Sequence, residues 1–222
     1  PFLSKCIGTS LAKLASKIIL GNTLKDLEFD SEIMPTNYAV KAPVFPFNKF
    51  RKVDPILGPE MKSTGEVMGQ GDTFGEAFAK AVRGAGENIP KEGNVFVSVK
   101  DTDKKHLPSL CEKLIDLGFK IVATKGTAKA LEGTDIKVKT INKVLEGRPH
   151  IVDAILNKEI NMIINTTEGR QATKDSASIR RSALEHSVFF TTTISGGFAI
   201  VESLEKCEDN WTYKPLQNSW DG

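Results

Sequence analysis

The stretch VFVSVKDTDKKHLPSLCEKLIDLGFKIVA, residues 95–123, decides the fold. It begins with a run of β-branched and aromatic residues at 95–99, and apolar residues then recur at helical spacing from Leu107 to Leu117. A second strand-like run follows at 120–123. A strand, a helix and a strand in this order predict two parallel strands joined by a right-handed crossover. Pro108 agrees with this assignment, because the first turn of a helix tolerates proline.

The same alternation continues toward the C-terminus. Further strand-like runs lie at residues 136–138, 162–164 and 188–190. Helical patterns lie at residues 127–131, 151–156, 176–185 and 195–204. Strands that alternate with helices indicate an α/β fold built on a parallel sheet. We therefore expect residues 91–222 to form one α/β domain, and no clear period places the tail after residue 205.

Residues 1–90 have a different character. Apolar residues recur at helical spacing from Leu11 to Ile19, and Gly21 follows as a stop signal. We expect this helix to bury one face against a partner domain outside the sequence. Residues 23–70 are rich in Pro and Gly, which predicts irregular segments with short strands.

A second helix is predicted near the end of this half. Thr73 and Glu76 match a capping box, in which the side chain of each residue accepts the backbone N–H of the other. Residues 84–90, rich in small residues and ending in Pro90, resemble an interdomain linker.

Composition excludes several classes of protein. The chain has 222 residues, 40% of them hydrophobic, and a formal net charge of +2, so no general basic field indicates nucleic acid. No apolar run approaches the roughly 20 residues that span a bilayer. Cys6, Cys111 and Cys207 have no metal-ligand spacing and suit reduced thiols in a cytoplasmic protein. The chain begins at Pro1 without a starting Met or a signal peptide, and we expect it to be a piece of a longer polypeptide.

Polar residues follow the ends of the predicted strands. Ser98 closes the first strand, residues 124–127 follow the second, and residues 165–169 follow the fourth. Ligands of open α/β sheets bind outside the carboxyl ends of the strands, where helix N-termini favour anions. Lys104 and Lys143 could supply full charges to a phosphate. Each element alone is more often a helix cap or a solvated face than a ligand contact, but their convergence on one edge predicts an anion site.

The stretch LGPEMKSTGEVMG, residues 57–69, fits neither a helical nor a strand repeat. One interpretation is a polar surface loop. The stretch also resembles a signature of the large subunit of carbamoyl phosphate synthetase. The resemblance continues at residues 1–5, 46–50, 147–150 and 180–184 and weakens only in about the last fifteen residues.

The resemblance implies a domain organisation. Residues 1–90 would be the closing segment of the second ATP-grasp unit together with a bridge, and residues 91–222 a methylglyoxal-synthase-like allosteric domain. The family makes carbamoyl phosphate from glutamine or ammonia, bicarbonate and two ATP, for pyrimidine and arginine synthesis. It uses Mg²⁺ (or Mn²⁺) and K⁺, a glutaminase small subunit and homo-oligomeric assembly.

The family's short acidic and amide-bearing motif for Mg²⁺ would precede Pro1 and is missing from the sequence. We therefore expect no catalytic residue, metal site or cofactor in this chain, and no synthase activity from it alone.

The resemblance also implies effector contacts. A nucleotide such as UMP or IMP would be held by Lys104, Thr124, Thr127, Lys143, Asn165, Thr166 and Thr167, with Ser98 and Asp175 nearby. Lys125 stands where relatives often have His, and either adds charge near the phosphate or points to solvent. An amino-acid effector contact is implied at Leu57 and Thr192. Ala42 replaces the Glu that binds ornithine in ornithine-activated relatives, which argues against ornithine because a methyl group cannot pair with an ammonium.

Two other functions stay open at this point. A free-standing lyase like methylglyoxal synthase would need catalytic aspartates, for which Asp101, Asp103 and Asp175 are the candidates. A pure assembly module would leave the anion site unused.

The remaining ionisable residues have simpler explanations than catalysis. Glu60 and Glu66 are expected to accept backbone N–H groups and set the loop. His106, His150 and His186 are expected at caps and on the surface.

Overall fold

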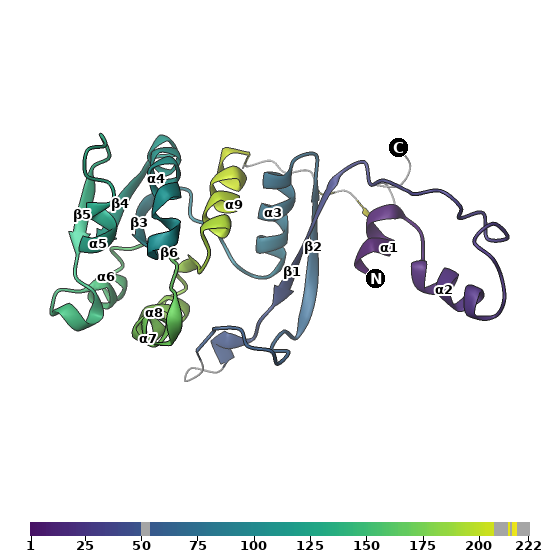
Figure 1. Ribbon diagram of the computed structural model, residues 1–222, viewed down its shortest axis with the longest axis horizontal. Helices are drawn as coiled ribbons and strands as arrows, with labels where there is room; N and C mark the ends of the chain where they lie inside the picture. The colour runs from purple at the N-terminus through teal and green to yellow at the C-terminus, as the bar shows by residue number, and fades with distance from the viewer. Residues whose placement is uncertain (50–53, 207–212, 214, 217–222) are drawn as a thin grey trace.

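A computed structural model describes residues 1–49, 54–206, 213, 215 and 216. Its second half is a five-stranded sheet with the strand order β5-β4-β3-β6-β7 (Figure 1). The strands are β3 (Gly93–Ser98), β4 (Phe119–Thr124), β5 (Val138–Ile141), β6 (Met162–Asn165) and β7 (Phe189–Thr191). All four pairings are parallel, which confirms the predicted α/β fold.

Helices cover both faces of this sheet. They are α4 (Leu107–Asp116), α5 (Lys125–Lys129), α6 (Ile151–Leu156), α7 (Gly169–Asp175), α8 (Ala177–Glu185) and α9 (Ile194–Glu205). The alternation of β3 separates two cores, because Val95 and Val97 pack with α4 and α9 while Phe96 packs with α6 and α8. Two short 3₁₀ helices, η2 (Asp101–His106) and η3 (Val144–Glu146), follow strands β3 and β5.

The first half contains an antiparallel strand pair with a helix packed on it. Its elements are α1 (Phe2–Ile7), α2 (Leu11–Ile19), β1 (Tyr38–Val44), the 3₁₀ helix η1 (Phe47–Lys49), β2 (Gly65–Gly71) and α3 (Phe74–Gly84). Gly69 of β2 lies so close to α3 that a Cβ there would collide with the carbonyl oxygen of Ala77. This position therefore requires glycine.

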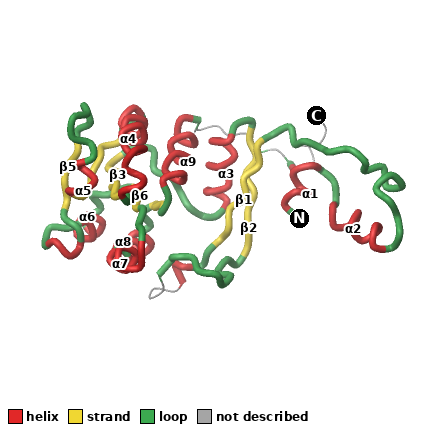
Figure 2. The backbone as a smooth tube through the Cα atoms, in the orientation of Figure 1, coloured by secondary structure: helices red, strands yellow, loops and turns green. Residues whose placement is uncertain are grey.

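The two halves pack against each other through α3 and α9, which lie side by side (Figures 1 and 2). A Cβ on Gly75 of α3 would collide with the carbonyl oxygen of Glu202 in α9. The segment that carries η1 contacts α8. The first half is thus joined to the sheet domain by packing as well as by the chain at residues 85–92.

Several sequence predictions need correction. The short strands predicted within residues 23–70 are present as β1 and β2. Residues 65–69, the end of the stretch for which one interpretation is a surface loop, belong to β2, in which three glycines hide the strand pattern. The strand predicted at 136–138 begins at Val138 instead, because residues 138–141 pair with β4. Helix α7 was not predicted, since its sequence GRQATKD has no apolar stripe.

The capping box is half confirmed. The Thr73 hydroxyl accepts the Glu76 N–H at 3.2 Å, but the Glu76 carboxylate accepts the N–H of Asp72 at 3.0 Å, one residue earlier than predicted.

Helix α1 was not predicted either, and α5 begins two residues before the predicted segment 127–131. Helix α6 matches residues 151–156 without a shift. Helix α2 buries none of its residues, and Ile19 is 85% exposed. Its burial against a partner domain stays a prediction. The predictions on Cys207 and on most of the tail fall outside the described residues. Among those residues, no helix is long and apolar enough to cross a membrane.

Candidate functional site

The predicted anion contacts begin at three neighbouring strand ends. Ser98, Thr124 and Asn165 are the last residues of β3, β4 and β6. Ser98 and Asn165 are Cα partners, and Val97 is the partner of Ala123 in the adjoining pair. Because parallel strands in register end at one edge of a sheet, these residues meet there. We call Ser98, Thr124, Thr127, Asn165 and Thr166 the strand-edge cluster.

Two threonines tie the ends of β3 and β4 together. The Thr124 hydroxyl donates to the Thr127 hydroxyl at 3.2 Å, and the N–H of Val99 donates to Thr127 Oγ1 at 3.2 Å. Both threonine residues are buried. Thr124 stands at the N-cap position of α5, but its side chain makes no cap hydrogen bond there. Since Thr127 accepts in both bonds, its own hydroxyl proton can serve a ligand.

The end of β6 is fixed by hydrogen bonds from two backbone N–H groups. The N–H of Thr166 donates to the carbonyl oxygen of Ser98 at 2.9 Å, and the N–H of Lys100 donates to Thr166 Oγ1 at 3.0 Å. Asn165 is 3% exposed, and its Nδ2 has no hydrogen-bond partner among the described residues. A buried amide without an acceptor is costly, by about 1–3 kcal/mol. The strand edge therefore presents a donor that calls for an acceptor.

Both predicted cations, Lys104 and Lys143, act on the carboxylate of Asp101. Lys104 Nζ lies 2.7 Å from the Asp101 carboxylate. The hydrogen bond from Lys104 lowers the pKa of Asp101, and the charges of Lys104 and then Lys143 lower it further. Asp101 is exposed, so its carboxylate can be displaced by a ligand anion. Lys104 and Lys143 are thus both within electrostatic reach of one negative group.

Thr167 and Asp175 stand beside this arrangement. The Thr167 hydroxyl lies 3.3 Å from the Thr173 hydroxyl, which links the residue after the cluster to α7. Asp175 ends α7 and accepts a hydrogen bond from Gln171 at 2.8 Å. Within the described chain, no hydrogen bond or ion pair joins Asp175 to the cluster, since its hydrogen-bond partner is Gln171.

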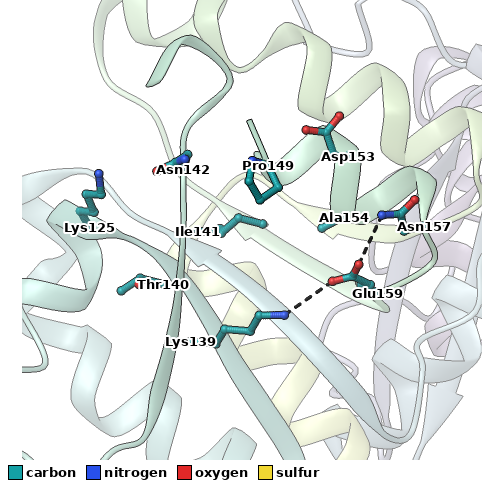
Figure 3. A pocket seen from close by; sticks show the side chains of 10 residues that line it. All are labelled: Lys125, Lys139, Thr140, Ile141, Asn142, Pro149, Asp153, Ala154, Asn157 and Glu159. Atoms are coloured by element: carbon teal, nitrogen blue, oxygen red, sulfur yellow. Dashed lines mark hydrogen bonds and ion pairs between the residues drawn. The ribbon is translucent and has the colours of Figure 1, made fainter. Parts of the chain in front are cut away.

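Lys125 directly follows Thr124 of the cluster and lines a hollow of its own. It is exposed, and the hollow, of about 240 Å³ at the edge strand β5, is also lined by Lys139, Thr140 and Asn157 (Figure 3). There Lys139 pairs with Glu159 at 3.5 Å, and the Lys125 amine points away from that pair. None of the predicted nucleotide contacts lines this hollow, which favours the solvent-facing interpretation of Lys125.

A larger hollow lies between the two halves. Its volume is about 730 Å³, and Leu57 from the first half and Thr192 from the second both line it. Phe45 and Phe47, stacked with ring centroids 5.1 Å apart, also line it. Glu87 lies on its wall, where desolvation raises the pKa of the carboxyl group. The structure thus brings together the two residues predicted to contact an amino acid.

The acidic residues of the first half show no catalytic arrangement. Glu66 pairs with Lys41 across the β1–β2 ladder at 2.7 Å, and the hydrogen bond from Lys41 lowers the pKa of Glu66. The prediction that Glu66 accepts backbone N–H groups is therefore wrong. Glu60 is exposed. No group of three His, Cys, Asp or Glu residues in the described part of the chain has the geometry of a metal site.

The histidines and the buried thiols have structural surroundings. His150 caps α6, where its Nδ1 accepts the N–H of Asp153 at 3.3 Å. The His186 ring contacts the carbonyl oxygen of Ser182 at the end of α8, and the His106 ring meets the edge of Phe198. Cys6 and Cys111 are free and buried.

Part of the sequence matches a known protein family. The family model for the MGS-like domain matches residues 106–192, which include most of the predicted contacts. This part of the chain is similar to the MGS-like domain family. The match lies inside the predicted domain at 91–222 and covers strands β4 to β7.

The relatives extend the similarity beyond the MGS-like domain. The chain is 60% identical over 205 residues to the carbamoyl phosphate synthase large chain of Pseudomonas syringae. The corresponding values are 53% over 208 residues for Halomonas eurihalina and 52% over 205 residues for Xanthomonas axonopodis. Each alignment covers 92% of this chain and 19% of the relative. The chain is thus similar to the C-terminal region of these large chains, as its sequence signature predicts, and spans about a fifth of their length.

One buried contact was missed by the sequence predictions. Arg180 of α8 is 2% exposed and binds Asp54 of the first half through two hydrogen bonds of 2.9 and 2.7 Å. A sequence signal was available, because Arg180 falls between Ile179 and Ala183, which face the sheet. A charge at such a position predicts a buried partner.

Proposed function

We propose that this chain is the regulatory C-terminal part of a carbamoyl phosphate synthase large chain and binds a nucleoside monophosphate at the strand-edge cluster. The parent would make carbamoyl phosphate from glutamine or ammonia, bicarbonate and two ATP in the cytoplasm, for pyrimidine and arginine synthesis. Mg²⁺ (or Mn²⁺), K⁺ and a glutaminase small subunit would belong to the parent and not to this chain. Homo-oligomeric contact is part of the same proposal.

The unpartnered Asn165 amide carries the proposal. It is a buried donor beside buried hydroxyls. Asp101, which follows Ser98 by three residues, is within electrostatic reach of Lys104 and Lys143. A phosphate provides several acceptor oxygens and negative charge, which matches this set. The Asn165 amide and the Thr127 hydroxyl would donate to phosphate oxygens. Lys104 and Lys143 would neutralise the charge in place of Asp101.

Regulation requires that the nucleotide bind two conformations of the parent unequally. A site on a rigid sheet edge supports selective binding, because its hydrogen-bond donors are positioned before the nucleotide arrives. The packing of α3 against α9 gives the MGS-like domain a firm contact with the first half.

The larger hollow supports an amino-acid effector as a second ligand. Leu57 and Thr192 both line it, and Glu87 offers a carboxylate for an ammonium group. Ala42 is not among its lining residues, so the replacement at position 42 does not bear on a ligand in this hollow, and the argument against ornithine rests on the family resemblance alone.

Calorimetric titration of UMP and IMP tests the proposed nucleotide site. We expect micromolar binding, about −8 kcal/mol, by at least one nucleotide. Lys143→Ala removes a charge-assisted contact and should weaken binding about tenfold or more. Lys139→Ala, at the other hollow, is the matched control and should bind normally. Equal binding by both variants would place the nucleotide elsewhere.

The lyase and the assembly module make other predictions. A lyase would release methylglyoxal from dihydroxyacetone phosphate, and an assembly module would bind neither nucleotide. Asp101 forms an ion pair with Lys104, which argues against Asp101 as a free catalytic base.

A further inference from the structure

Arg180 holds the two halves of the chain together from a nearly solvent-free position. Its Nε donates to Asp54 Oδ1 at 2.9 Å and its Nη2 to Asp54 Oδ2 at 2.7 Å, a bidentate pair that joins residues 126 positions apart. Burial alone would raise the pKa of Asp54, but the hydrogen bond and charge of Arg180 lower it overall. Such a fork fixes both distance and orientation.

The same guanidinium also bonds to the helix next to the strand-edge cluster. Arg180 Nη2 donates to the carbonyl oxygen of Thr173 at 2.8 Å, in the last turn of α7. The Thr173 hydroxyl in turn lies 3.3 Å from the Thr167 hydroxyl. Thr167 follows directly after Asn165 and Thr166. Thr167 is therefore linked to the Arg180 side chain by two hydrogen bonds, both made by Thr173.

On the other side, Asp54 shapes the wall of the larger hollow. Its Oδ1 accepts the N–H of Ile56 at 3.3 Å, and Lys62 Nζ donates to the carbonyl oxygen of Ile56 at 3.0 Å. Ile56 and Leu57 line the hollow together with Thr173 and Arg180. The position of residues 54–57 thus depends on where Arg180 stands (Figure 1 shows this segment beside α7 and α8).

Nη2 of Arg180 serves two acceptors that belong to different parts of the chain. A displacement of α7 would draw the guanidinium toward the Thr173 carbonyl group or away from it, and Asp54 would have to follow or lose its bond. Because an unpaired buried charge is strongly unfavourable, the arrangement favours joint movement over separation.

We propose that Arg180 is a positioning residue that couples occupancy of the strand-edge cluster to the placement of residues 54–57. The inference rests on the proposed nucleotide site. It assigns the coupling to one side chain with three hydrogen bonds. Coupling is measured at both ends, as UMP binding at the strand-edge cluster and as amide exchange at residues 54–57.

The experiment combines calorimetry with hydrogen–deuterium exchange measured by mass spectrometry on the 222-residue chain, with and without saturating UMP. The variant is Asp54→Asn, which keeps the shape of the side chain and removes its charge. The matched control is Glu66→Gln, which removes the exposed Lys41–Glu66 pair of the same half. Arg180→Lys is a second variant, because one ammonium cannot form the two-pronged bond.

The coupling predicts that UMP slows amide exchange in residues 54–71 of the wild type and of Glu66→Gln by about fivefold or more. In Asp54→Asn and Arg180→Lys, UMP should still bind with a Kd within about fivefold of the wild-type value, and the response of residues 54–71 should be lost. A purely structural pair would raise exchange in both states equally and leave the response to UMP intact.

The outcomes separate the two proposals. UMP binding with an unchanged exchange response in both variants would overturn the coupling and leave the nucleotide site standing. UMP binding with no response in the wild type would do the same. Absence of UMP binding to the wild type would overturn the nucleotide site and the coupling that rests on it.

Discussion

Ser98 and Asn165 stand opposite each other at the ends of β3 and β6, and the residue after Asn165 donates its N–H to the carbonyl oxygen of Ser98 at 2.9 Å. This bond extends the parallel ladder one step past the strands and holds the Asn165 side chain at the sheet edge. The Cα atom from which the unpartnered amide extends is therefore held by the backbone, and the residue is 3% exposed. A donor that is held in place before a ligand arrives loses little conformational entropy when it binds.

Thr127→Val tests the hydroxyl pair. The substitution keeps the shape of the side chain but leaves the N–H of Val99 buried without an acceptor, which costs about 1–3 kcal/mol. Urea unfolding should show this loss of stability. Thr140→Val, at an exposed position of β5, is the control and should change the free energy of unfolding by less than about 0.5 kcal/mol. Equal effects of the two variants would contradict the role of Thr127.

Gly69→Ala tests the close packing of α3 on β2. The added methyl group would collide with the carbonyl oxygen of Ala77 and force the helix away from the strand. We expect a loss of about 1–3 kcal/mol in the free energy of unfolding. Gly65→Ala, in the same strand, meets no atom within 4 Å and is the matched control. Equal free energies of unfolding in both variants would contradict the close packing of α3 against Gly69.

These glycines also show why the strand pattern of residues 65–71 was hidden. Gly65, Gly69 and Gly71 interrupt the alternation of side chains. The close approach of α3 accounts for Gly69, and this approach cannot be read from the sequence. By contrast, residues 95–123 contain uninterrupted apolar runs with a glycine between the helix and the second strand, so their fold was predictable.

The site likewise contains residues that the sequence predicts and residues that it does not. The residues at the strand ends were predictable because parallel strands bring their carboxyl ends to one edge. The Asp54–Arg180 pair and helix α7 depend on contacts between residues far apart in sequence, and α7 is held by Thr167 and Arg180 rather than by an apolar face.

Asp54→Asn is expected to destabilise the chain in a pH-dependent manner. The pKa of Asp54 in the folded state is lowered from 3.8, so its ionised form contributes stability that is present above about pH 4 and is lost as the pH falls through the folded-state pKa. At pH 7 the variant should lose about 1–3 kcal/mol, less than a fully buried pair, because the Asp54 side chain is one-third exposed. Urea unfolding of both proteins from pH 7 to pH 3 measures the difference. A difference that grows as the pH falls would contradict this account.

Cys111 should be unreactive in the folded chain. Burial raises the pKa of its thiol to about 12, and the nearby Glu112 charge adds to the effect. Since the thiolate is the reactive form, iodoacetamide at pH 8 should leave Cys111 unmodified and should modify it fully in urea. Peptide mapping by mass spectrometry measures both. Rapid labelling of the folded protein at Cys111 would show that α4 opens readily.

The most direct test of the central claim is a calorimetric titration of UMP into the wild type and into Asn165→Asp. The substitution keeps the size of the side chain but replaces the amide donor with a group that repels phosphate when ionised and cannot reproduce the amide when protonated. Asn157→Asp, at the edge-strand hollow, is the matched control, and circular dichroism confirms that each variant is folded. The account predicts micromolar binding by the wild type and Asn157→Asp, and a loss of at least about a hundredfold in Asn165→Asp, about 2.7 kcal/mol. Binding of UMP by folded Asn165→Asp with the wild-type Kd would contradict it.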